Sequence, residues 1–345
     1  MRRGALLGLA AAALFGLSAP LAKVLLDSVP PVLLAGILYL GAAAGLWLHR
    51  LAKPQTIEAR LATSDIPKLS IVVVVGGILG PLLMLLGLSR VTALAGSLLL
   101  NLEAPLTVLI AVAAFHEHLG RRTAAATAFI VGGAAILKIE PGAIGADGAG
   151  VLLLAGACAC WALDNNLTQR LSLHDPFAIV RVKTLVAGSF NTALGLFLLR
   201  GQIPQVRYVA AAMALGSVSY GLSIVLDAYA LRTVGAAREA ALFATAPFVG
   251  ALASLVVLQE PLRWYVVAAM LLMGIGVALL LQERHAHVHG HEALEHEHVH
   301  EHDEHHQHQH GPSDPDGQRH SHRHVHERLI HDHPHLPDAH HRHRH

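Results

Sequence analysis

Long apolar stretches alternate with short polar connections along the chain as far as residue 282. A membrane-spanning helix needs about 20 mostly apolar residues. Inside a bilayer each backbone donor and acceptor must be paired within its own segment, so such stretches favour helices. We therefore predict ten transmembrane helices, at residues 4–22, 32–49, 69–88, 92–115, 123–139, 148–168, 177–199, 208–228, 235–258 and 264–282.

The distribution of Lys and Arg among the connections predicts the orientation. Eleven of these cations fall on the side that holds both termini and six fall on the other side. Cytoplasmic loops carry the excess of positive charge. We expect a multi-pass protein of the inner (plasma) membrane with both termini in the cytoplasm.

Two halves of the chain repeat the same pattern. Arg90 precedes Pro105 by fifteen residues, and Arg232 precedes Pro247 by the same distance. Each half holds five predicted helices, an odd number, so the copies must cross the membrane in opposite senses. The fold class is therefore an all-α integral membrane protein of two inverted five-helix repeats, 4–139 and 148–283, an arrangement typical of secondary transporters.

The amino-acid composition agrees with an integral membrane protein and argues against several other classes of protein. Hydrophobic residues make up 53% of the chain and charged residues 14%. Its two cysteines, Cys158 and Cys160, lie in an apolar stretch, which excludes a disulfide framework. Nothing in the sequence matches a nucleic-acid-binding module, and no nucleophile has a partnered base, so we expect neither a nucleic-acid partner nor an enzyme.

The sequence resembles the EamA family of the drug/metabolite transporter superfamily. The resemblance rests on short motifs, most of which recur in both halves. Near the start of each half are Ala13-Leu14-Phe15-Gly16 with Pro20, and Cys160-Trp161-Ala162. Later in each half are Ala104-Pro105 and Ala246-Pro247, and then the acidic residues of His116-Glu117-His118-Leu119 and Gln259-Glu260-Pro261-Leu262. It implies a ten-helix inner-membrane transporter, usually an exporter of small metabolites. Residues Asp164, Asn165 and Asn166 depart from the family pattern.

Glu103 is the strongest candidate for the solute or ion pathway. It falls near the middle of the fourth predicted helix, where an ionisable group is costly and by default functional. Pro105 frees the backbone carbonyl of Asn101, which lies on the same helical face. The three residues predict a polar patch on a central cavity, in which Glu103 binds and releases a proton. The alternative is a protonated Glu103 that only bonds a neighbouring helix.

Further candidates lie on other helices. Pro247 is the counterpart of Pro105 and predicts a second kink, unless both prolines simply bend their helices. Tyr220 and Asp227 share one face of the eighth predicted helix, as pore lining or as packing contacts. Asp164 is a third acidic pathway candidate.

Charges of both signs gather toward the cytoplasmic ends of the sixth to ninth helices. The bases are Arg181, Lys183 and Arg238, and the acids are Asp164, Asp227 and Glu239. Equal numbers at similar depth suggest ion pairs, since pairing offsets the cost of burial. We expect a cytoplasmic ion-pair gate, with ordinary helix flanks as the alternative.

Histidine dominates residues 285–345, which hold 23 of the 27 histidines. So polar a segment cannot bury a core and is expected to be disordered without metal. Neutral imidazole binds Zn, Ni, Co and Cu. The predicted ligands begin with His285, His287, His289, His291, His296, His298, His300 and His302.

The sequence thus predicts a secondary transporter, a monomer or homodimer in the lipid bilayer, that exports a small molecule by alternating access and requires no cofactor. Two alternatives stay open: a divalent transition-metal (Ni, Co or Zn) efflux transporter, and a membrane-anchored metal buffer or sensor.

Overall fold

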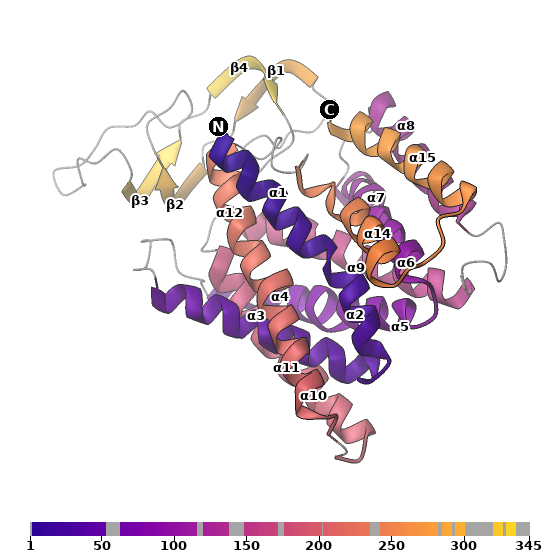
Figure 1. Ribbon diagram of the computed structural model, residues 1–345. Helices are drawn as coiled ribbons and strands as arrows, with labels where there is room; N and C mark the ends of the chain where they lie inside the picture. The colour runs from indigo at the N-terminus through magenta and orange to yellow at the C-terminus, as the bar shows by residue number, and fades with distance from the viewer. Residues whose placement is uncertain are drawn as a thin grey trace.

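The computed structural model describes residues 2–52, 63–115, 120–137, 148–171, 176–201, 203–234 and 242–281, and four short strands after them. Each predicted apolar stretch contains helix where the structure describes it (Figure 1). The first repeat contains α1 (Arg2–Gly16), α2 (Ser18–Leu26), α3 (Pro31–Ala52), η1 (Thr63–Asp65), α4 (Ile66–Val72), η2 (Val73–Leu79), α5 (Gly80–Leu88), α6 (Ala93–Leu99), η3 (Leu100–Leu102), α7 (Glu103–Phe115) and α8 (Arg121–Ile136). The second contains α9 (Gly148–Leu171), α10 (Pro176–Leu198), α11 (Val206–Leu215), η4 (Gly216–Leu222), α12 (Ser223–Val234), α14 (Ala246–Val257) and α15 (Trp264–Leu281).

Within the described part of the chain, six helical stretches are long and apolar enough to cross a membrane. They are Arg3–Leu26, Pro31–Ala52, Ile66–Leu88, Ala93–Ile110, Gly148–Thr168 and Val206–Ala230, and two shorter apolar helices are Ala246–Val257 and Trp264–Leu280. Large apolar side chains also cover the outside of the bundle: Leu152, Phe197 and Val256 are each more than 70% exposed. A surface of this kind belongs against lipid. The chain is a multi-pass membrane protein, and the count of ten crossings stays a prediction.

Equivalent helices of the two repeats pack on one another. The second helices meet as α3 against α10, the fourth as α6 against α14, and the fifth as α8 against α15. The first helix of each repeat packs against the third of the other, α1 on α12 and α9 on α5. The core of the bundle therefore lies between the repeats.

Glycine allows the closest of these approaches. A Cβ added at Gly36 of α3 would lie 2.3 Å from the backbone N of Thr192 in α10. One added at Gly188 of α10 would lie 2.8 Å from the backbone N of Leu40. Membrane helices depend on small residues at such crossings, because no hydrophobic force drives their association within lipid.

Both third helices contain a seven-residue π-helical segment. η2 separates α4 from α5, and η4 separates α11 from α12. A π-helix widens the turn and is frequently found at functional sites. In the fourth helix, the 3-10 segment η3 separates α6 from α7 just before Glu103.

The described parts of the histidine-rich tail form two antiparallel pairs. β1 (His285–His291) pairs with β4 (Leu329–His335), and β2 (Leu294–His300) with β3 (His320–His326). The structure here differs from the predicted absence of regular structure. The alternation of histidine with other residues matches the two-residue period of a strand. The effect of metal on the tail stays a prediction.

Candidate functional site

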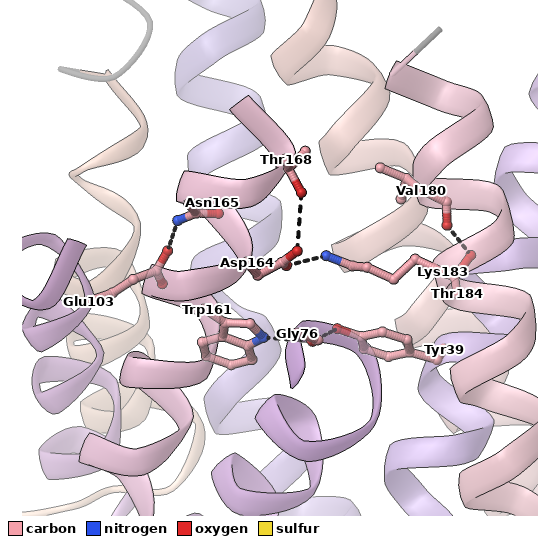
Figure 2. Close-up of polar contacts among 10 residues, drawn as sticks. All are labelled: Tyr39, Gly76, Glu103, Trp161, Asp164, Asn165, Thr168, Val180, Lys183 and Thr184. Carbon is pink, nitrogen blue, oxygen red and sulfur yellow. Dashed lines mark hydrogen bonds and ion pairs between the residues drawn. The ribbon is translucent and has the colours of Figure 1, made fainter. Parts of the chain in front are cut away.

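A buried ion pair joins α9 and α10 and forms, with Glu103 and Asn165, the central cluster (Figure 2). The Asp164 carboxylate of α9 accepts from the Lys183 ammonium of α10, and from the Thr168 hydroxyl at 3.1 Å. Asp164 is only 3% exposed. Burying two charges is costly unless each is paired and hydrogen-bonded. The pair meets both conditions, and it joins the first two helices of the second repeat.

The π-helix η2 packs against the Asp164–Lys183 pair. A Cβ added at Gly76 would lie 2.2 Å from Asp164 Oδ2, so only glycine admits the carboxylate there. The Gly76 carbonyl accepts from Trp161 Nε1 at 3.1 Å and from the Tyr39 hydroxyl at 3.4 Å. Two residues after Gly76, the Ile78 carbonyl accepts from the Asn191 amide at 3.3 Å. The first repeat thus offers backbone acceptors to side chains from both repeats.

Glu103 lies beside this pair at the first position of α7. Its Oε1 accepts from Asn165 Nδ2 at 2.7 Å, and Asn165 is exposed. Glu103 itself is half-buried. Among the described residues it has no ion-pair partner. With Asp164 neutralised by Lys183, ionised Glu103 gives the cluster one net negative charge.

The structure does not bring Asn101 to Glu103, contrary to the predicted patch. Asn101 is buried, and its amide donates to Leu98 O at 3.1 Å and toward the Met273 sulfur of α15 at 3.9 Å. The 3-10 turn between the two residues breaks the helical periodicity on which that prediction depended. Pro105 is buried at the third position of α7, where the helix restarts and does not merely bend.

Pro247 also lies near a helix start. It is the second residue of α14, and Thr245 precedes that helix with its hydroxyl donating to Leu242 O at 2.6 Å. A proline in the first turn loses no helical hydrogen bond. Residues 242–243 are helical and 244–245 form a turn, so the helix is interrupted directly before Pro247 and restarts as α14. The predicted role of this break in lining a cavity stays a prediction.

Two residues of the predicted gate form an ion pair: Lys183 pairs with Asp164, which the sequence also offers as a pathway residue. Arg181 and Asp227 are half-buried, and each interacts with another group. Arg238 and Glu239 lie outside the described residues. The gate stays a prediction.

Tyr220 belongs to an aromatic cluster. Its ring meets Phe15 edge-on at 5.7 Å and Tyr39 at 6.1 Å between centroids. Ser223, one turn on, donates to Ala11 O at 2.9 Å. These contacts favour the packing interpretation of that face.

Metal ligands are not gathered within the helices. Among the described residues, no group of three or more His, Cys, Asp or Glu is placed to hold an ion. The Cys158 thiol is buried and faces the carbonyls of Leu99 at 3.7 Å and Leu100 at 3.8 Å. His49 bonds the Tyr229 hydroxyl at 3.0 Å beside Phe177.

Sequence reasoning missed three contributors to the cluster: Tyr39, Gly76 and Trp161. Trp161 was visible in the Cys-Trp-Ala motif but carried no predicted contact. The pair Gly76-Gly77 in an otherwise β-branched and apolar run was the one signal of a close approach.

Two sets of helices pack around buried polar groups, and comparisons with known proteins identify the class of protein. The model of the EamA-like transporter family matches residues 2–139 and 148–282, the two predicted repeats. The chain belongs to this family. An uncharacterized transporter of Methanothermobacter thermautotrophicus is 29% identical over 269 residues, 72% of this chain and 77% of its own. A protein of known crystal structure shares the fold, with a TM-score of 0.58 and 21% identity over 80% of this chain and 96% of its own.

Proposed function

We propose that the chain is a secondary transporter that exports a small metabolite across the inner membrane by alternating access. The observation that carries the proposal is the central cluster of Glu103, Asn165, Asp164 and Lys183. Its residues come from both repeats, and the Gly76 carbonyl of the first repeat faces side chains of the second. A polar site between repeats is where a transporter of this construction binds its solute.

Glu103 is the proposed coupling residue. Its side-chain partner among the described residues is a neutral amide, so its carboxylate can take up and release a proton, whereas Asp164 is held by an ammonium. A proton bound to Glu103 would neutralise the cluster. Transport should then be driven by the proton gradient.

Counterflow into proteoliposomes tests this function. Purified protein is reconstituted with unlabelled amino acids, nucleosides or sugars inside, and uptake of the same labelled compound is followed. One of these classes should accumulate with the wild-type protein and not with Asp164→Asn. If none accumulates while Zn²⁺, Ni²⁺ or Co²⁺ does, the protein is a metal exporter.

The second candidate function, transport or binding of a divalent metal, is supported by the register of the strands in the histidine-rich tail. In the β1–β4 pair, His285, His287 and His289 lie opposite His335, His333 and His331. In the β2–β3 pair, His296, His298 and His300 lie opposite His324, His322 and His320. Alternate residues share a face of a strand, so each pair sets a row of facing histidine positions. Such rows suit borderline divalent metals, which the tail would deliver, sense or buffer.

A further inference from the structure

The turn between α5 and α6, Ser89 to Thr92, is held by an ammonium at one side. Lys23, in the last turn of α2, donates to Leu88 O at 2.6 Å and to Val91 O at 2.8 Å. These carbonyls lie at the end of α5 and in the turn, where the helix dipole favours a cation. Lys23 is therefore fixed by two backbone acceptors and does not simply extend toward water.

A carboxylate holds the other side of the same turn. Glu260 lies between α14 and α15 and accepts from the first two backbone N–H groups of α6. Ala93 N lies 2.8 Å from Oε1, and Leu94 N lies 2.7 Å from Oε2. The third N–H, that of Ala95, bonds the Thr92 hydroxyl oxygen at 3.2 Å. The N-terminus of α6 in the first repeat is thus capped by a side chain from the second.

The backbone before Glu260 is strained into this position. Gln259 has φ of +52°, in the left-handed region that favours glycine. It directly follows Leu258, the C-cap residue of α14. A glutamine held there turns the chain so that the next carboxylate reaches α6.

Beneath the cap, α6 and α14 are in close contact. A Cβ added at Gly250 of α14 would lie 2.9 Å from the Ser97 hydroxyl oxygen of α6. Ser97 is 1% exposed, and its hydroxyl has no hydrogen-bond partner among the described residues. α6 and α14, the fourth helices of the two repeats, are therefore closed against each other at Ser97, about one turn along α6 from the N–H groups that Glu260 accepts from.

We propose that Lys23 and Glu260 form a latch on the α5–α6 turn. The latch keeps α6 against α14 at this end of the bundle and releases α6 when that end opens for the solute. The inference rests on the proposed transport cycle. In that cycle Glu260 is a positioning residue: it contacts the helix that moves, not the solute.

Cysteine reactivity measures the latch without knowledge of the solute. In a Cys158→Ala, Cys160→Ala background, Ser97→Cys places a thiol in the closed seam at almost no change in volume. Alkylation by N-ethylmaleimide is timed in native membranes. Glu260→Gln can accept at only one oxygen and presents an NH2 to the other donor. Losing charge-assisted hydrogen bonds shifts a closed–open equilibrium by about tenfold or more, so the introduced thiol should react at least about tenfold faster.

Ser89→Ala is the control, because Ser89 lies in the same turn and its exposed hydroxyl, among the described residues, donates only to Leu86 O, at 2.8 Å, within α5. It should leave the rate unchanged, and Lys23→Met should raise the rate as Glu260→Gln does. The latch is refuted if folded Glu260→Gln protein alkylates at the wild-type rate, or if Ser89→Ala accelerates alkylation equally. Where Glu260→Gln protein is not recovered from membranes, Lys23→Met decides by the same two criteria. Counterflow through Asp164→Asn tests transport separately from this measurement.

Discussion

The Asp164–Lys183 pair matters at the scale of single residues because each charge makes the burial of the other tolerable. The carboxylate is almost fully buried and has Thr168 as a further donor. An unpaired charge left in such a place costs far more than the loss of one contact, whereas removing both charges can be nearly neutral. Single and double substitutions therefore separate stability from function.

Asp164→Asn alone should lower the free energy of unfolding by about 3–5 kcal/mol, because it leaves the Lys183 ammonium buried without its partner. Asp164→Asn with Lys183→Met should recover most of that stability. Thermal unfolding in detergent measures both variants. If the double variant is stable but has no counterflow, the pair takes part in transport. A double variant with full counterflow would restrict the pair to a structural role.

Glu103→Gln keeps the size of the side chain and the Asn165 contact but cannot bind and release a proton. Transport by the wild-type protein should rise with an imposed proton gradient, and the variant should be insensitive to it while still exchanging solute. Proteoliposome flux at several imposed pH differences measures this. Thr107→Val, which removes a hydroxyl bonded to Glu103 O at 2.8 Å, is the control and should keep the gradient dependence. An unchanged gradient dependence in Glu103→Gln would exclude Glu103 as the coupling residue.

At the scale of elements, η2 places the central cluster. Its two consecutive glycines face the second repeat: a Cβ at Gly76 would meet Asp164, and one at Gly77 would lie 2.9 Å from the Ala187 side chain. A continuous α-helix over the same residues would change which carbonyls face Trp161 and Tyr39. The π segment therefore couples the backbone of the third helix to the ion pair.

Gly76→Ala should force the Asp164 carboxylate away and destabilise the protein by about 1–3 kcal/mol, the usual cost of overpacking. Counterflow should fall with it. Gly132→Ala is the matched control, since Gly132 lies within α8 and an added Cβ meets nothing within 4 Å. It should be neutral or slightly stabilising. Melting temperatures of the two variants give the comparison, and equal melting temperatures would contradict the close approach.

The helices were predictable because length and hydrophobicity alone decide them. The breaks within them were not. The π segments at Val73 and Gly216 and the 3-10 turn before Glu103 follow from packing against distant helices, which no local pattern records. For the same reason the sequence grouped Asn101 with Glu103, whereas the Asn101 amide contacts Leu98 O and the Met273 sulfur. The pathway roles of Glu103 and Asp164 stay predictions.

At the scale of the whole molecule, the pairing of equivalent helices gives the bundle an approximate twofold organisation. α1 begins and α15 ends at the same side of it (Figure 1). The described polar contacts between the repeats include the cluster around Gly76 and the cap that Glu260 places on α6. Others are spread along the bundle, such as Ser217 to Gly41 O at 2.7 Å and Ser223 to Ala11 O at 2.9 Å. Motion of one repeat against the other would break and form such contacts within a largely apolar core.

Truncation after Arg284 separates the bundle from the tail. Both segments matched by the family model end before that residue, so the truncated protein keeps the whole central cluster. It should retain wild-type counterflow and lose nearly all Zn²⁺ and Ni²⁺ binding in a calorimetric titration, because only four of the 27 histidines remain. The full-length protein in the same membranes is the control. If truncation abolishes metal tolerance in cells and neither protein moves an organic solute, the bundle is an anchor for a metal buffer. A transporter, by contrast, depends on contacts that lie wholly before residue 284 and keeps its flux when the histidines are gone.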